Sequence, residues 1–398
     1  PSRIQTAIAN GLHPVTTDDG TYYGYSWARS GLNPLAAVQT SNMANKTFSV
    51  NGMTYANIKP FKNFVFTTRL GYTFGNVANQ SYNPTRLDGY FKDVDAPLDL
   101  RSQQVAARYY QWENFLNYMI ESEKLGNFSI MAGSSYVNKE RNIVGAQTNE
   151  LSSEEPNFIY LNYSTTSAND FVSGNLYYQR QIAYYGRFSW DYMNRYNVQA
   201  NFRADSYDAA YLDLNHNWGY FPSISAGWTF TNENFMESLK GNFFSYGKLR
   251  ASYGINGSIS NLGNYMYAAT LRTGQYDLSN NTANMAYWLD SKLYRGTYPN
   301  SILANPELRW ERSKQQNYGL DLRFLNDRLS TTIEYYNKLT DGLLVQSVAP
   351  LVTGANTVYQ NLGEVTNSGV ELELSWKDKI GDFSYEVKGS FATVNNIV

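Results

Sequence analysis

The chain contains no cysteine, which excludes a disulfide framework and a thiolate metal site. Histidine is scarce as well: His13 and His216 lie far apart, and neither has the spacing of a metal motif. Residues 213–217 loosely resemble the start of a calcium loop, but Trp218 stands where glycine is needed and Ile224 where the last glutamate belongs. We therefore expect ordinary loop residues here, with no metal and no cofactor.

Long apolar runs are also missing. No stretch of about 18 apolar residues occurs, so we expect no transmembrane helix. The first residues lack the basic and apolar regions of a signal peptide, so none is expected at this end. The sequence starts and stops abruptly, and we expect both ends to belong to something longer.

Neither sign of charge dominates, because 32 basic residues are matched by 34 acidic ones. This balance argues against a nucleic-acid or polyacid partner. Glu371 and Glu373 form a carboxylate pair of the kind that can do hydrolytic chemistry, but a polar wall explains them more simply. No Gly-x-Ser-x-Gly elbow is followed by a suitable histidine. We therefore predict that the protein is not an enzyme.

Aromatic residues, by contrast, are abundant. The chain has 35 tyrosines, 20 phenylalanines and 8 tryptophans, which together make up 16% of it. A globular core could hold some of these rings. Outer-membrane barrels have a specific use for the rest, because rings with a polar tip form girdles at the two membrane interfaces.

Alternation of apolar and polar side chains recurs along the chain, and this period of two indicates β-strands. The clearest stretches are residues 196–204, 224–230, 249–253, 317–324, 329–335, 370–376 and 383–391. In a soluble sandwich the apolar face would pack on a second sheet. In a membrane barrel it would meet lipid while the polar face lined the lumen. Alternation alone leaves both possibilities open.

The lengths of the connections favour the barrel. Short connections are expected near residues 191–195, 326–327 and 377–382, and long ones near 140–172, 206–219, 256–313 and 340–363. Loops beyond about 15 residues are uncommon in compact domains. Alternation of short and long connections is typical of outer-membrane barrels, with short periplasmic turns and long external loops. One periplasmic connection, 231–247, is longer, and residues 233–236 could form a helical turn in it.

We therefore predict an all-β fold, namely part of an antiparallel transmembrane β-barrel in the outer membrane. About twelve strands of about 10 to 18 residues each are expected. Residues 1–398 would form a single partial β-barrel domain. Gly219 and Gly227 suit crowded positions in the curved wall, where a side chain would clash.

Several local strings occur in a specific order over most of residues 31–398. They are NPLA (33–36), NFRAD (201–205), WGYFPSISAGW (218–228), ENFM (233–236), LRASYGING (249–257), LRWERS (308–313), EYYNK (334–338), NLGEV (361–365) and NSGVEL (367–372). In order and spacing they resemble the SusC-like family of TonB-dependent outer-membrane transporters of Bacteroidetes.

The resemblance implies a barrel of about 22 strands filled by an N-terminal plug. It implies a SusD-like surface lipoprotein as a lid over the external mouth, and a dimer of transporter–lid pairs. The expected activity is import of oligosaccharides or peptides, energised through TonB. Measured against that family, we expect residues 1–398 to lack the plug, the TonB-contacting segment and the C-terminal strands.

The longest predicted loop is rich in aromatic residues. Those singled out are Tyr265, Tyr267, Tyr276, Tyr287, Trp288 and Tyr294. Aromatic rings stack on sugar faces and pack against peptide side chains. We predict that some of them contact the imported ligand or the lid. The alternative is that they pack the loop against itself.

Two other functions remain open at this point. A passive, porin-like channel is the main alternative, and a barrel-anchored adhesin or surface enzyme is another. A plug domain would favour the importer, whereas a conducting trimer without a plug would favour the channel. The predicted lumen face carries both signs of charge, so we expect no strong charge selectivity.

Overall fold

The structure is a computed structural model that describes most of the chain. The described residues are 25–26, 29–32, 42–83, 87–88, 91–92, 99–148, 150–153, 155–165, 170–208, 211–239, 241, 243–273, 275–277, 282–284, 286–289 and 292–398. Contacts divide the chain into two units, one of residues 1–53, 71–110 and 138–178 and the other of residues 54–70, 111–137 and 179–398. His13 and the string at residues 33–36 lie outside the described residues.

Twelve long strands run through the structure, and several pass from one unit into the other. They are β3 (Asn42–Ile58), β4 (Phe64–Asn83), β7 (Asp99–Ser122), β8 (Gly126–Thr148), β9 (Phe171–Tyr192), β10 (Tyr196–Tyr207), β11 (Trp218–Trp228), β12 (Phe244–Ser258), β20 (Glu311–Phe324), β21 (Leu329–Val348), β22 (Thr357–Ile380) and β23 (Phe383–Ala392). The predicted number of strands is confirmed. The predicted lengths were too short for several of them, since β7 and β22 each contain 24 residues.

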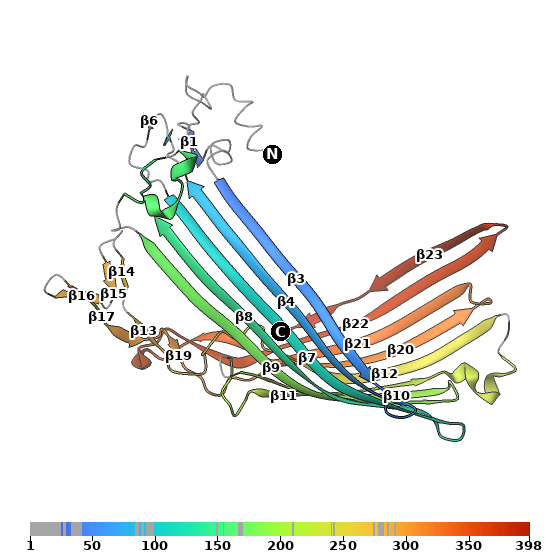
Figure 1. The fold of residues 1–398 in the computed structure, drawn as a ribbon. Helices are drawn as coiled ribbons and strands as arrows, with labels where there is room; N and C mark the ends of the chain where they lie inside the picture. Colours follow the sequence, from blue (N-terminus) through green and yellow to red (C-terminus); the bar gives the residue numbers. More distant parts are fainter. Residues whose placement is uncertain are drawn as a thin grey trace. The chain divides into compact units, whose positions relative to one another are not determined.

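These strands belong to one sheet in which neighbours along the chain are neighbours in space (Figure 1). The order runs β3-β4-β7-β8-β9-β10-β11-β12-β20-β21-β22, and β23 pairs with β22. The pairs from β9 to β23 are antiparallel. Beside β23, the same edge of β22 also pairs with β24 (Asn395–Ile397), and with β19 (Ile302–Leu303), which runs parallel to it.

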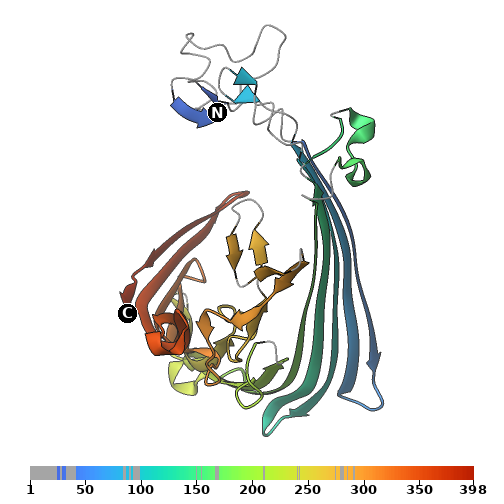
Figure 2. The ribbon, with the colours of Figure 1, turned by 90° about the vertical axis from the view of Figure 1, so that its left-hand side faces the viewer.

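Short strands lie before β3 and in the connections between the long strands. In the first unit, β1 (Tyr25–Ser26) pairs with β2 (Arg29–Leu32), and β5 (Leu87–Asp88) pairs with β6 (Phe91–Lys92). In the second unit, the connection between β12 and β20 contains β13 (Leu271–Thr273), β14 (Gln275–Asp277), β15 (Thr282–Asn284), β16 (Ala286–Leu289), β17 (Lys292–Arg295) and β18 (Thr297–Pro299). Figure 2 shows the short strands of the second unit in gold.

Short and long connections alternate, as predicted. Residues 123–125, 193–195, 325–328 and 381–382 form tight turns, whereas residues 149–170, 208–217 and 259–310 form longer connections. Several turn residues have left-handed backbone conformations, among them Asn194 (φ 53°) and Gly381 (φ 62°), which asparagine and glycine adopt at little cost. In an antiparallel sheet alternate connections lie at the same end, so the tight turns share one end.

Two predicted loops were wrong in extent. The loop expected at residues 340–363 is mostly strand, because β21 and β22 stay paired from Leu329 opposite Trp376 to Val348 opposite Thr357. Likewise β8 continues to Thr148, so that loop begins only at residue 149. Backbone pairing continues through segments in which the apolar alternation has faded, such as residues 140–148 and 340–348.

Much of the apolar face of the sheet is left uncovered by the residues that the structure describes. Phe202 on β10 is 49% exposed and Ile224 on β11 is 52% exposed. Trp228, Leu322 and Leu372 are only partly buried. A dry core between two packed sheets, which is the sandwich alternative, would have buried all of them.

Among the described residues, two small clusters of buried apolar side chains stand out. In the first unit, Tyr82, Leu100 and Leu151 pack together. In the second unit, a cluster at the root of the long 259–310 connection has as its buried members Leu212, Ile259, Leu262, Leu308 and Trp310. We call this second cluster the loop root.

No helix among the residues that the structure describes is long and apolar enough to cross a membrane. Within the same residues, no group of three or more histidine, aspartate or glutamate side chains is arranged to hold a metal ion.

Candidate functional site

Arg250 on β12 is the centre of a charged network that crosses three strands on the polar face. Its Nε lies 3.2 Å from Asp321 Oδ2 on β20, and its Nη2 lies 2.5 Å from Glu334 Oε2 on β21. Asn317 Nδ2 donates to Glu334 at 2.5 Å, and Thr332 Oγ1 donates to Asp321 at 3.1 Å. Both carboxylates therefore have neutral donors as well as the guanidinium, which is the arrangement that makes partly buried charges tolerable.

Glycine makes this crossing possible. Gly319 lies directly opposite Arg250 on one side and Glu334 on the other. A Cβ at Gly319 would lie 2.5 Å from Arg250 Nε, so any side chain would push the guanidinium away from Glu334. The predicted crowding at Gly219 and Gly227 is confirmed, since a Cβ would lie 2.4 Å from Phe221 Cζ or from Asn197 Oδ1.

A second charged group lies further along the polar face. Asp205 on β10 is 4% exposed and receives two hydrogen bonds from Arg203, with distances of 2.7 Å from Nε and 2.8 Å from Nη2. Gln181 Nε2 donates to the same carboxylate at 2.8 Å. The Arg203 guanidinium also lies over the ring of Tyr185, at 5.5 Å from its centre. In both groups the charges are thus neutralised by partners within the wall.

Glu371 lies in the wall directly opposite Glu334, and Glu373 lies opposite Thr332. Both glutamates are exposed on β22. Their position in a strand of the polar face agrees with the polar-wall interpretation of the pair.

The loop root fixes the start and end of the long connection. Leu212 and Leu308 are fully buried there, and Trp310 Nε1 donates to Asn217 O at 3.2 Å. The buried Glu311 accepts two hydrogen bonds of 3.0 Å from Asn261 and one of 2.9 Å from the backbone of Leu344 on β21. These bonds join the connection to the wall.

The six predicted loop aromatics fall into two groups. Tyr267 packs against the loop root, and burial raises the pKa of its hydroxyl. Tyr265, two residues earlier, is 44% exposed. The other four lie in the small strands. Tyr287 on β16 pairs with Tyr294 on β17, Trp288 pairs with Leu293, and Tyr276 on β14 pairs with Ala283. Contact of these residues with a ligand or a lid stays a prediction.

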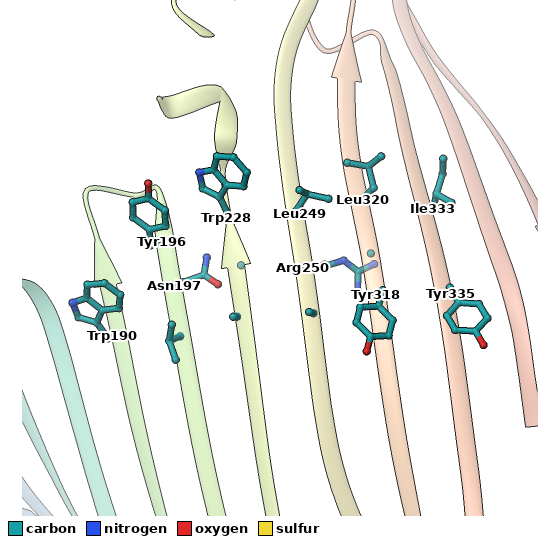
Figure 3. A pocket seen from close by; sticks show the side chains of 15 residues that line it. Trp190, Tyr196, Asn197, Trp228, Leu249, Arg250, Tyr318, Leu320, Ile333 and Tyr335 are labelled. Carbon is teal, nitrogen blue, oxygen red and sulfur yellow. The ribbon is translucent and has the colours of Figure 1, made fainter. Parts of the chain in front are cut away.

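A shallow depression on the apolar face crosses strands β9 to β12, β20 and β21 near the tight-turn end (Figure 3). Ala226 and Ala251 leave room in it, because their side chains are small. Trp190 on β9, Trp228 on β11 and Tyr335 on β21 are among the aromatic residues that line the depression. The lining is almost wholly aromatic and aliphatic, so the depression suits hydrocarbon and offers no chemistry for a polar substrate.

Next to the depression, Glu233 ties the β11–β12 connection to the wall. Trp228 Nε1 donates to Glu233 Oε1 at 3.0 Å, the Tyr196 hydroxyl donates to the same carboxylate, and Arg195 Nη1 lies 3.3 Å from Oε2. The hydrogen bonds from Tyr196 and Trp228 hold the pKa of the Glu233 carboxyl below its ordinary value, and Arg195 adds to this. The predicted helical turn is present as a 3₁₀ helix over Asn234–Met236.

A family model described as "TonB dependent receptor-like, beta-barrel" matches residues 5–397. The chain belongs to that family. As a receptor it lies in the outer membrane, with the apolar face of the sheet toward lipid and the polar face toward the lumen. The family consists of transport receptors, which agrees with the prediction that the protein is not an enzyme.

Curated relatives of the chain include SusC and other TonB-dependent receptors. TonB-dependent receptor P39 of Formosa agariphila is 30% identical over 366 residues, covering 90% of this chain and 32% of the relative. TonB-dependent receptor SusC of Bacteroides thetaiotaomicron is 32% identical over 212 residues, covering 52% of this chain and 20% of SusC. The chain spans about a third of the length of the first three curated relatives that it matches.

The solved structure of the RagAB peptide transporter has the same fold. It matches with a TM-score of 0.80 at 20% sequence identity, over 95% of this chain and 40% of the solved one. The predicted TonB-dependent family is confirmed by the family match, and the predicted fold class by this structural likeness.

Proposed function

We propose that the receptor actively imports oligosaccharides or peptides across the outer membrane, with energy delivered through TonB. The observation that carries this proposal is the family match over residues 5–397, together with SusC-like relatives. RagAB is described as a peptide importer, which supports peptides as one substrate class. The polar wall adds support, because its charges are paired with one another and leave a mixed, hydrogen-bonding surface suited to large polar molecules.

We propose further that a SusD-like lipoprotein covers the external mouth, and that residues 1–398 belong to a larger barrel closed around a plug domain of the same receptor. The barrel follows from the open sheet: a transmembrane sheet must close, because unpaired backbone groups in hydrocarbon cost several kcal/mol each (roughly). The long connection between β12 and β20 supplies surface that a lid would contact.

An uptake assay in cells tests the importer. Labelled oligosaccharides and peptides are offered to cells that produce the whole receptor and to cells that lack it. We expect receptor-dependent uptake of one class, abolished when the proton motive force is dissipated or TonB is deleted. Uptake that survives both treatments would contradict active import and would indicate a passive channel.

The loop aromatics have a separate test. Tyr287→Ala with Trp288→Ala removes two rings from the β16–β17 hairpin, and Tyr265→Phe serves as a control that keeps its ring. We expect the double variant to lower uptake or to weaken co-purification of the lid at least several-fold, with the control unchanged. If the double variant matches the unmodified receptor in both measurements, the predicted contact is wrong.

A further inference from the structure

The connection between β11 and β12, residues 229–243, presents large apolar side chains that no described residue covers. Phe235 and Leu239 are each 64% exposed, and Phe243 is 70% exposed. Polar side chains such as Glu237 are exposed beside them. The segment is therefore amphipathic, and it lies at the end of the sheet that carries the tight, periplasmic turns.

This connection is held in place by the neighbouring β9–β10 turn. The backbone N–H of Thr229 donates to Arg195 O at 2.7 Å, and Asn232 Nδ2 donates to Asn194 O at 2.9 Å. The carboxylate of Glu233 binds the same turn, as described above. The connection is therefore held to the turn at Thr229, Asn232 and Glu233.

The exposed rings continue the lipid-facing surface of the wall. The ring of Phe235 lies 6.5 Å from that of Trp228, and the ring of Phe243 lies 5.8 Å from that of Phe324. Trp228 lines the apolar depression, which opens directly beside the connection (Figure 3). An apolar surface thus runs without a break from the strands onto a segment that is not a strand.

We propose that Glu233–Leu239 and Phe243 form an interfacial anchor, which inserts Phe235, Leu239 and Phe243 into the periplasmic leaflet of the outer membrane. A phospholipid surface is the occupant that the geometry favours, because lipid already covers the apolar face with which these side chains are continuous. Trp228 and Tyr196 direct their polar tips to Glu233, the orientation that rings adopt at the boundary between hydrocarbon and water.

The anchor would have a mechanical role that the strands alone cannot have. Strands of a barrel resist sliding along the membrane normal only through the edges of their apolar band. A segment in the interface that is bonded through Glu233 to Arg195, Tyr196 and Trp228 would fix the depth of this part of the wall. It would do so on the side of the membrane from which a periplasmic protein pulls.

Site-directed spin labelling tests the anchor. The chain has no cysteine, so single substitutions Phe235→Cys, Leu239→Cys and Glu237→Cys can be labelled in the whole receptor, with any cysteine outside this chain replaced by serine. The labelled receptors are placed in phospholipid nanodiscs. Collision of each nitroxide with oxygen, which concentrates in lipid, is compared with collision with a water-soluble nickel chelate.

We expect labels at 235 and 239 to collide at least several-fold more with oxygen than with the nickel chelate, and the label at 237 to show the reverse. Preference for nickel at both apolar positions would mean that they lie in water, and protection from both reagents would mean that a protein surface covers them. Either result would overturn the anchor.

Folding of each variant is checked by the heat-dependent gel mobility of an intact barrel. Should Phe235→Cys fail to fold, Leu239→Cys and Phe243→Cys carry the same test, because each position is exposed and truncation there leaves no cavity. The result is independent of transport, so failure of the anchor would leave the importer proposal untouched.

Discussion

Two apolar clusters of the second unit have similar residues and opposite surroundings. At the loop root, Leu212 and Leu308 are fully buried by other side chains. At the tight-turn end, Phe235 and Phe243 pack against other rings on one side only and are largely exposed on the other. The loop root extends into water, so protein must cover its apolar groups. The turn end and the wall adjoin lipid, which covers them instead.

The same contrast separates the two faces of the sheet. Polar side chains on the lumen face are paired across strands, as Arg250 is with Asp321 and Glu334. Apolar side chains on the other face, such as Ile224, need no protein partner. The effect of a substitution on stability should therefore depend on whether the side chain faces protein, lipid or the aqueous lumen. Four substitutions test this dependence.

Trp310→Ala should have the largest effect, because it removes a buried ring and its hydrogen bond from the loop root. We expect the loop root to lose about 3–5 kcal/mol of stability. The loss of stability is measured by the hydrogen exchange of peptides that cover residues 208–217 and 305–312. The control Tyr265→Ala, at an exposed ring of the same segment, should change the free energy of local opening by no more than about 0.5 kcal/mol. Equal effects would remove the distinction between buried and exposed positions.

Ile224→Arg comes next, because it places a charge on the lipid-facing side of β11. The expected cost is about 2–4 kcal/mol near the middle of the bilayer. Urea unfolding of the receptor from liposomes provides the measurement. Ser225→Arg, one residue along and on the lumen face, should cost much less. A larger loss for Ser225→Arg than for Ile224→Arg would reverse the assignment of the faces.

Gly319→Ala should destabilise the wall by about 1–3 kcal/mol, because the added Cβ displaces the Arg250 guanidinium. Gly389→Ala on β23 is the matched control, since no atom lies within 4 Å of a Cβ built there. Combining Gly319→Ala with Arg250→Ala should cost less than the sum of the two separate changes. Strict additivity in urea unfolding would show that the two residues do not interact.

Glu233→Gln should have the smallest effect, and one that depends on pH. The folded carboxyl has a lowered pKa, so its charge stabilises the connection above the ordinary pKa of a glutamate. That contribution is lost as the pH falls through the lowered pKa. Hydrogen exchange of residues 229–243 should therefore be faster in the variant at pH 7 and the same in both proteins in strong acid. A difference in exchange rate between the two proteins that persists unchanged in strong acid would show that the charge of Glu233 does not stabilise the connection.

Much of the fold follows from the sequence, because a period of two with one apolar face is visible wherever a strand crosses hydrocarbon. Residues 317–324 and 329–335 were placed correctly for this reason. The region 340–363 was not, because its strands extend beyond the apolar band and lose the alternation while keeping their backbone pairing. Strand ends outside the membrane leave no signal in the pattern of hydropathy.

The candidate site was predicted only in part. The sequence places six aromatic residues in the longest connection, and the structure shows which of them share a hairpin and which lie at the loop root. The bonds of Arg250 to Glu334, across the intervening Gly319, could not be predicted, because they depend on the register of three strands. The helical turn at Asn234–Met236 was predicted, but its attachment to Arg195 was not, for the same reason.

The central claim is that alternate side chains of the wall point into lipid and into water. It is tested most directly on β10, with single cysteines at Asn201, Phe202, Arg203 and Ala204, each labelled with bimane in the membrane-embedded receptor. Brominated lipid should quench the labels at 202 and 204, whereas iodide in the aqueous phase should quench those at 201 and 203. Quenching by the same reagent at all four positions would contradict the account.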